Sequence, residues 1–134
     1  MTANTDKKDK PPLARLLVVD DDPDTVLALN ISLLYYGFLV DAFTNPEEAL
    51  QKFKSNAESY RLVLLDNKMP TLSGIQLARK VKEANPNVKV LVLTALKVRN
   101  NELSDVSSST NVDGFIQKPV GIKELTDKIL SLIG

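Results

Sequence analysis

Residues 16–24 read Leu-Leu-Val-Val-Asp-Asp-Asp-Pro-Asp, and this stretch decides the fold. Four consecutive apolar residues are too few for a helix and end in two valines, so they predict a strand that is buried on both faces. Asp22 and Pro23 then supply the N-cap and the first position of a helix that ends near Tyr35, with Gly37 after it. A buried strand that runs directly into a capped helix is typical of parallel α/β sheets.

The same alternation of a short apolar run and an amphipathic stretch continues to the end of the chain. The other predicted strands are residues 38–43, 62–65, 88–93 and 115–117, and the other helices are residues 46–56, 75–84, 97–111 and 122–133. The pattern is weakest at 97–111, because asparagines and a serine-rich run lower the helix propensity there. Five strand-helix alternations predict an α/β fold, with a doubly wound parallel sheet and helices on both faces.

The composition is that of one soluble domain. Of the 134 residues 43% are apolar and 25% are charged, which excludes a disordered or fibrous chain. We expect residues 1–12, which are polar and end in two prolines, to form a disordered tail, and residues 13–134 to form the domain. No apolar run could span a bilayer and the N-terminus has no apolar signal segment, so we expect a cytoplasmic protein that does not bind membranes.

Three residue counts limit the chemistry. Seventeen basic residues balance seventeen acidic ones, so the field that attracts nucleic acid is lacking and we expect no direct nucleic-acid partner. The absence of cysteine excludes disulfides, thiolate nucleophiles and Cys-based zinc sites. The absence of histidine excludes a Ser-His-Asp triad and a His-ligated metal. Any chemistry must therefore use carboxylates, lysines and hydroxyls.

Four carboxylates stand within five residues after the first strand. Such close like charges repel and raise one another's pKa unless a cation lies among them. Helix capping explains Asp22 and Asp24, because anions are favoured at a helix N-terminus. It does not explain Asp20 and Asp21, for which a metal site and a chance pair of aspartates both remain open.

The third strand also ends in a carboxylate, Asp66. Alone, this residue would be read as the start of an Asx turn. In a parallel sheet with strands one and three as neighbours, however, Asp66 comes close to Asp20 and Asp21, because the carboxyl ends of the strands share one edge. Three converging carboxylates favour a hard divalent cation, and Mg²⁺ suits a site with few protein ligands because it keeps waters and accepts phosphate oxygens.

The fourth and fifth strands end near a hydroxyl and an ammonium group. Thr94 alone is ordinary strand material, and Lys118 alone is an ordinary surface lysine. Together with the carboxylates they suit phosphoryl transfer to a carboxylate, with a metal neutralising the developing charge and Lys118 and Thr94 contacting the other oxygens. Pro119 also allows a cis peptide bond after Lys118.

Four segments, in this order and spacing, carry a family resemblance over nearly all of residues 13–134. LLVVDDDPD, LVLLDNKMPTLSG, VLVLTA and GFIQKP resemble the receiver domain of two-component response regulators, in particular its chemotaxis-regulator-like members. The resemblance implies a flavodoxin-like sheet of order 2-1-3-4-5. It also implies the site residues: Asp66 as phosphoacceptor, Asp20, Asp21, Asp66 and the Lys68 carbonyl as Mg²⁺ ligands, Thr94 and Lys118 as phosphoryl-binding groups, and Thr94 with Phe115 as the switch.

The resemblance implies a signalling domain rather than an enzyme, with at most self-phosphorylation from a donor and self-dephosphorylation. Its partners would be a sensor histidine kinase or histidine phosphotransfer protein, and a downstream protein that binds the face formed by residues 97–111, 115–117 and 122–133.

The sequence departs from the family pattern at Val120, where an aromatic residue is usual, and at residues 107–115 before the fifth strand. An alternative is a receiver-like binding module that acts without phosphorylation. A flavin or nucleotide binder of the same topology is less favoured, because no glycine-rich phosphate loop is present.

Overall fold

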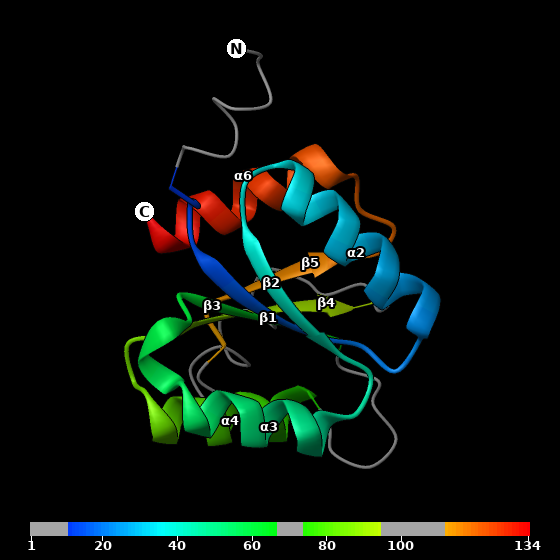
Figure 1. Ribbon diagram of the computed structural model, residues 1–134. Helices are drawn as coiled ribbons and strands as arrows, with labels where there is room; N and C mark the ends of the chain where they lie inside the picture. Colours follow the sequence, from blue (N-terminus) through cyan, green and yellow to red (C-terminus); the bar gives the residue numbers. More distant parts are fainter. Residues whose placement is uncertain (1–10, 67–73, 95–111) are drawn as a thin grey trace, which may run out of the picture.

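A five-stranded parallel sheet forms the centre of the protein (Figure 1). The computed structural model describes residues 11–66, 74–94 and 112–134. The strand order is β2-β1-β3-β4-β5, which confirms the predicted doubly wound topology. The strands are β1 (Arg15–Val19), β2 (Leu39–Phe43), β3 (Leu62–Asp66), β4 (Lys89–Thr94) and β5 (Gly114–Gln117).

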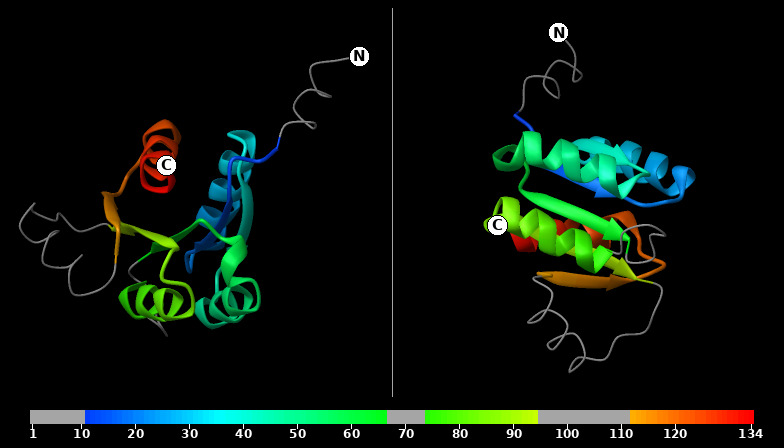
Figure 2. Two further views of the ribbon diagram at one scale, coloured as in Figure 1. Left: turned by 90° about the vertical axis from the view of Figure 1, so that its left-hand side faces the viewer. Right: turned by 90° about the horizontal axis from the view of Figure 1, so that it is seen from below.

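Helices cover both faces of the sheet (Figure 2). They are α2 (Pro23–Tyr35), α3 (Pro46–Ser55), α4 (Gly74–Ala84) and α6 (Ile122–Ile133), and a short 3₁₀ turn, η1 (Ala57–Ser59), precedes β3. Helices α2 and α6 lie on one face, and α3 and α4 lie on the other. The predicted tail up to residue 10, the loop with Met69 and Pro70, and the predicted helix at 97–111 lie outside the described residues.

The inner strands β1, β3 and β4 carry continuous apolar runs because each of them contributes side chains to two cores. Leu17 and Val19 of β1 belong to the core under α3 and α4, whereas Leu16 and Val18 belong to the core under α2 and α6. Successive side chains of a strand point to opposite faces, so continuous apolar runs are what a sheet covered on both sides requires. This confirms that the runs are buried strands.

The predicted helix caps are present. The Asp22 side chain accepts hydrogen bonds from the Asp24 backbone N–H at 3.1 Å and from the Thr25 hydroxyl at 2.8 Å. Asn45 caps α3 in the same way, and Gly37 has a φ of +102°, a conformation that favours glycine. The Asp22 cap fixes where the polypeptide turns after β1, and so fixes where Asp20 and Asp21 lie.

Hydrogen bonds tie the ends of the sheet to the helices. Arg61 donates to the Ile133 carbonyl at 2.6 Å, which holds the last turn of α6. Asp113 pairs with Lys82 of α4 at 2.9 Å and accepts from the Val90 backbone N–H at 2.7 Å.

None of the helices in the described segments has the length and apolar content that crossing a bilayer demands.

Candidate functional site

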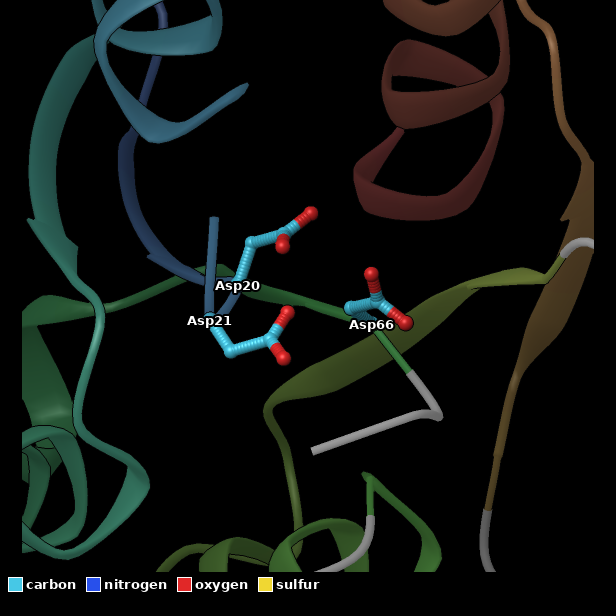
Figure 3. A group of neighbouring side chains, drawn as sticks. All are labelled: Asp20, Asp21 and Asp66. Carbon is cyan, nitrogen blue, oxygen red and sulfur yellow. The ribbon is translucent and has the colours of Figure 1, made fainter. Parts of the chain in front are cut away.

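Three carboxylates meet at the carboxyl edge of the sheet. Asp20 and Asp21 follow β1, and Asp66 is the last residue of the neighbouring strand β3. One carboxylate oxygen from each lies within 4.8 Å of the others, and Figure 3 shows Asp20 and Asp21 extending toward Asp66. The predicted convergence of these side chains is therefore present in the structure.

The burial of the three carboxylates differs. Asp20 is 2% exposed and Asp66 is 6% exposed, whereas Asp21 is open to solvent. One oxygen of Asp20, Oδ1, accepts a hydrogen bond from the Asp22 backbone N–H at 3.0 Å. The other, Oδ2, is buried without a hydrogen-bond partner in the described part of the chain. An unsatisfied buried carboxylate oxygen is costly, and it is the kind of group that a bound cation would satisfy.

Asp20 is held in an environment that disfavours its charge. Burial raises the pKa of Asp20 from its ordinary value of 3.8 to about 6, and the neighbouring charge of Asp66 adds to the increase. The hydrogen bond from Asp22 and the charge of Lys118 oppose it. At neutral pH most Asp20 side chains are therefore ionised, but at an electrostatic cost.

Lys118 provides a positive charge against this cluster. Its Nζ lies 2.6 Å from Asp66 Oδ2 and 3.7 Å from Asp20 Oδ2. Burial lowers the pKa of Lys118, but the hydrogen bond to Asp66 and the charges of Asp66, Asp20 and Asp21 outweigh it and raise the pKa above its ordinary value. The ammonium group therefore stays charged at neutral pH. Within the described ranges, one ammonium faces three carboxylates, so the site fits a divalent cation with oxygen ligands.

The backbone of β5 fixes Lys118 beside Thr94. The Lys118 N–H donates to the Thr94 carbonyl at 2.7 Å, and the peptide bond from Lys118 to Pro119 is cis. Thr94 is buried at the end of β4. Phe115 pairs with Val92 in the sheet and packs against the core under α3 and α4. Because side chains alternate along a strand, Thr94 and Phe115 share one face of the sheet.

The structure thus brings Asp20, Asp21, Asp66 and Lys118 together and places Thr94 beside them. The Lys68 carbonyl, predicted as a metal ligand, lies outside the described residues. The sequence predicted raised pKa values in this cluster from like-charge repulsion, but not that burial by distant segments is the largest cause of the raised pKa of Asp20.

A groove next to the site was not predicted. It has a volume of about 610 Å³, lies between α2 and α6, and reaches Lys118. Helix α2 contributes Thr25, Ala28, Leu29 and Ser32 to its lining. Three of these side chains are small, and their spacing of three and four residues along a helix is the signal that could have revealed the groove.

The crowded negative charge at this site predicts how Asp20→Asn changes the free energy of unfolding. Without divalent cations at pH 7, we expect this variant to be more stable than the wild type by ~1–2 kcal/mol, because an amide carries no charge into the buried site and its oxygen can still accept from Asp22. Urea unfolding in EDTA measures this difference. Asp21→Asn, at an exposed position, should change the stability by less than ~0.5 kcal/mol. A less stable Asp20→Asn protein would contradict this picture of the site.

The stability difference should also depend on pH. The pKa of Asp20 is higher in the folded protein than in the unfolded chain. Protonation of Asp20 therefore adds to the free energy of unfolding below about pH 4, and this addition is lost as the pH rises through about 6. The wild type should therefore approach the stability of Asp20→Asn as the pH falls from 7 to 4.5. Parallel curves for the two proteins over this range would contradict the raised pKa.

Comparisons with known proteins agree with this geometry. The model of the response regulator receiver domain family matches residues 16–130. The chain is 36% identical over 122 residues to the transcriptional regulatory protein CpxR homolog of Haemophilus influenzae, covering 90% of this chain and 51% of that protein. It is 31% identical over 123 residues to hybrid signal transduction histidine kinase L of Dictyostelium discoideum, covering 87% of this chain and 7% of that protein. The chain thus spans about half the length of the first relative and a small part of the second.

Solved structures show the same relationship. The response regulator TrrA of Thermotoga maritima, solved in complex with Mg²⁺-BeF, has a TM-score of 0.75 and 36% identity, with 90% of this chain and 99% of that chain covered. A receiver domain protein of Clostridium thermocellum has a TM-score of 0.80 and 28% identity, with 90% and 94% covered. Fold, site and sequence agree, and the chain belongs to the response regulator receiver domain family of two-component systems.

Proposed function

We propose that this chain is a Mg²⁺-dependent phosphoacceptor that receives a phosphoryl group on Asp66 from a phosphohistidine. The observation that carries the proposal is the set of three carboxylates within 4.8 Å of one another, with Lys118 2.6 Å from Asp66. Residues 1–134 contain no histidine, so the phosphohistidine must lie outside them. Its carrier would be a histidine kinase or a histidine phosphotransfer protein, and we expect the transfer to take place in the cytoplasm.

The metal would be held by Asp20, Asp21 and Asp66. The donors are all oxygens, as Mg²⁺ prefers. Asp20 Oδ2 is a buried ligand atom that has an ion pair with Lys118 at 3.7 Å but no hydrogen-bond partner among the described residues. The Mg²⁺-BeF complex of the T. maritima relative supports this assignment. From the family resemblance, the Lys68 carbonyl would be a further ligand. When bound, Mg²⁺ would neutralise charge on the phosphoryl oxygens during transfer.

The side chains of the site would carry out the transfer. An Asp66 oxygen forms a bond to phosphorus while the bond from phosphorus to the donor's imidazole nitrogen breaks, and the imidazole takes up a proton as it leaves. Lys118, which stays charged at neutral pH, moves from the Asp66 carboxylate to a phosphoryl oxygen. The Thr94 hydroxyl donates to another phosphoryl oxygen. These contacts match the charge distribution of phosphoryl transfer.

The signal would leave the site through β4 and β5. Phosphorylation adds up to two negative charges and strong acceptors, which draw the Thr94 hydroxyl toward Asp66. Phe115, on the same face of the sheet, would then move into the space that Thr94 leaves. The surface formed by residues 97–111, β5 and α6 would change its population of states and bind a downstream protein.

The raised pKa of Asp20 predicts how Mg²⁺ binding depends on pH. Protons and the metal compete for the carboxylate, and the pKa of Asp20 is about 6. The apparent Mg²⁺ affinity should therefore be about tenfold weaker at pH 5 than at pH 7. Isothermal titration calorimetry at both pH values measures this. An affinity that is equal at pH 5 and pH 7 would contradict a role for Asp20 as a ligand.

A binding module that acts without phosphorylation is the less favoured alternative. It would bind its partner equally well with or without Mg²⁺ and a phosphodonor. The carboxylates, Thr94 and Lys118 would have no role in such a protein, yet all are present. Incubation with Mg²⁺ and a small phosphodonor, followed by intact mass measurement, separates the two functions.

A further inference from the structure

A small polar pocket lies at the amino edge of the sheet, at the opposite end of the strands from the phosphoacceptor site. Its volume is about 190 Å³. Six side chains with polar groups line it, namely Arg15, Asp41, Lys52, Asn56, Ser59 and Tyr60. Arg15 is the first residue of β1 and Asp20 follows the last one, so these two residues are roughly 16 Å apart. The pocket is therefore separated from the phosphoacceptor site by the length of a strand.

One wall of the pocket is a network of hydrogen bonds around Asp41 of β2. Its Oδ2 accepts from the Tyr60 hydroxyl at 2.5 Å and from Arg15 Nη1 at 3.1 Å. Tyr60 is buried and its ring stacks on Phe53 of α3. Burial and the hydrogen bond to Asp41 raise the pKa of Tyr60, so its hydroxyl stays protonated at neutral pH. The network therefore holds the Arg15 guanidinium in place and balances the charge of Asp41.

The walls of the pocket carry a net positive charge. Lys52 of α3 adds a second cation, and it forms no ion pair with any other described residue. At neutral pH the two cations face one carboxylate and a neutral phenol, so the net charge of the lining is +1. Asn56 and Ser59 add an amide and a hydroxyl, which can both donate hydrogen bonds.

The size and the lining of the pocket favour a small anion. Sites for drug-sized molecules have volumes of about 300–1,000 Å³, and the space here corresponds to roughly six water molecules at ~30 Å³ each. An apolar side chain of a partner protein would leave the charged groups without water, which is costly. The donors come from β1, from α3 and from the turn η1, so they can reach an anion from several sides. A tetrahedral phosphate group has oxygens on all sides and suits this arrangement better than a flat carboxylate.

We propose that this pocket is a second ligand site of the chain and that it binds a phosphate group, either as inorganic phosphate or on a small phosphorylated molecule. The Arg15 guanidinium and the Lys52 ammonium would bind the phosphoryl oxygens, and Asn56 and Ser59 would donate further hydrogen bonds. The carbonyl end of α3 carries a partial negative charge that opposes the anion. We therefore expect a weak site, with a dissociation constant of about 1–10 mM.

Titration with sodium phosphate at constant ionic strength, followed by ¹H–¹⁵N NMR of the labelled chain in EDTA, tests the proposal. The backbone amides of residues 52–60 should shift in a saturable way. The proposal does not rest on phosphorylation of Asp66, so Asp66→Asn should bind phosphate as the wild type does. Shifts that do not saturate by about 50 mM would overturn the proposal, and so would a loss of binding in Asp66→Asn.

Two lysines of α3 provide a matched pair of variants. Lys52 lines the pocket, whereas Lys54 is also exposed but lines a different depression. Lys52→Glu should weaken phosphate binding at least about tenfold, and Lys54→Glu, with the same change in total charge, by less than about twofold. Ser59→Leu, which fills part of the pocket without changing its charge, should weaken binding at least about fivefold. Equal effects of the two lysine variants, or wild-type affinity in Ser59→Leu, would overturn the assignment to this pocket.

Three anions separate the possible sources of the ligand. The pocket has room for more than a phosphate group, so glycerol phosphate should bind at least as tightly as inorganic phosphate. Such a result assigns the site to small phosphorylated molecules, whereas tighter binding of inorganic phosphate assigns it to the free ion. Acetate should bind at least about threefold more weakly than phosphate, because it offers two oxygens in one plane and a single charge. Acetate that binds as tightly as phosphate would overturn the proposed phosphate site.

Discussion

Incubation with Mg²⁺ and acetyl phosphate should add one phosphoryl group, about 80 Da, to the wild type and none to Asp66→Asn. The reason is geometric and chemical. The Asp66 carboxylate lies 2.6 Å from the charged Lys118 and close to the oxygens of Asp20 and Asp21, which would hold Mg²⁺. The lysine and the metal would together neutralise the charge that develops on a phosphoryl group there. An amide at this position is a much weaker nucleophile. Intact mass spectrometry of both proteins, before and after incubation, measures the adduct.

A matched variant controls for the general reactivity of carboxylates. Asp24 is an exposed aspartate in the first turn of α2 and does not belong to the cluster. Asp24→Asn should gain the same 80 Da adduct as the wild type, within about twofold in rate. An adduct on Asp66→Asn equal to that on the wild type would place the acceptor elsewhere. No adduct on the wild type would remove the proposed function.

The second large effect concerns Asp20. The initial rate of phosphorylation should fall by about a hundredfold or more in Asp20→Asn, because the variant loses a charged metal ligand and the metal stabilises the transferring group. We expect EDTA to lower the rate of the wild type by at least as much. Mg²⁺ titration by calorimetry should show a matching loss of affinity in the variant.

The stability of Asp20→Asn makes this result decisive. Without metal, the variant should be more stable than the wild type, so a loss of activity cannot be explained by unfolding. A protein that is more stable but inactive is the expected result where charges crowd a site for the sake of function. If Asp20→Asn kept wild-type Mg²⁺ affinity and rate, the metal would be held without Asp20 and the proposed ligand set would be wrong.

Much of the fold could be predicted because local signals agreed. The apolar runs 16–19 and 62–65 are strands, and Asp22, Asn45 and Gly37 cap or end helices as expected. The boundaries differ slightly, since β3 and β4 include Asp66 and Thr94 as their last residues. A polar residue can continue a ladder of backbone hydrogen bonds, although its side chain gives no apolar signal. The turn η1 was not predicted, because a single 3₁₀ turn has no periodicity to detect.

The site could be predicted less completely than the fold. Strand order brought Asp66 to Asp20 and Asp21, so the cluster followed from topology. Repulsion between the carboxylates predicted raised pKa values, but the burial that raises the pKa of Asp20 most and the groove beside α2 did not follow from the sequence, because both depend on how side chains from distant elements pack. The proposed helix at 97–111 and the carbonyl of Lys68 stay predictions.

The hydrogen bond from the Lys118 N–H to the Thr94 carbonyl has a consequence for folding kinetics. Lys118 and Asp66 are 52 residues apart in the chain, and Lys118 reaches its position only when the edge strand β5 joins β4. Contacts between such distant segments form late, since closing long loops is slow. A nascent or partly refolded chain that lacks β5 would have its carboxylates without their ammonium partner. We therefore expect protection of the Lys118 amide against hydrogen exchange to appear together with competence for phosphorylation during refolding.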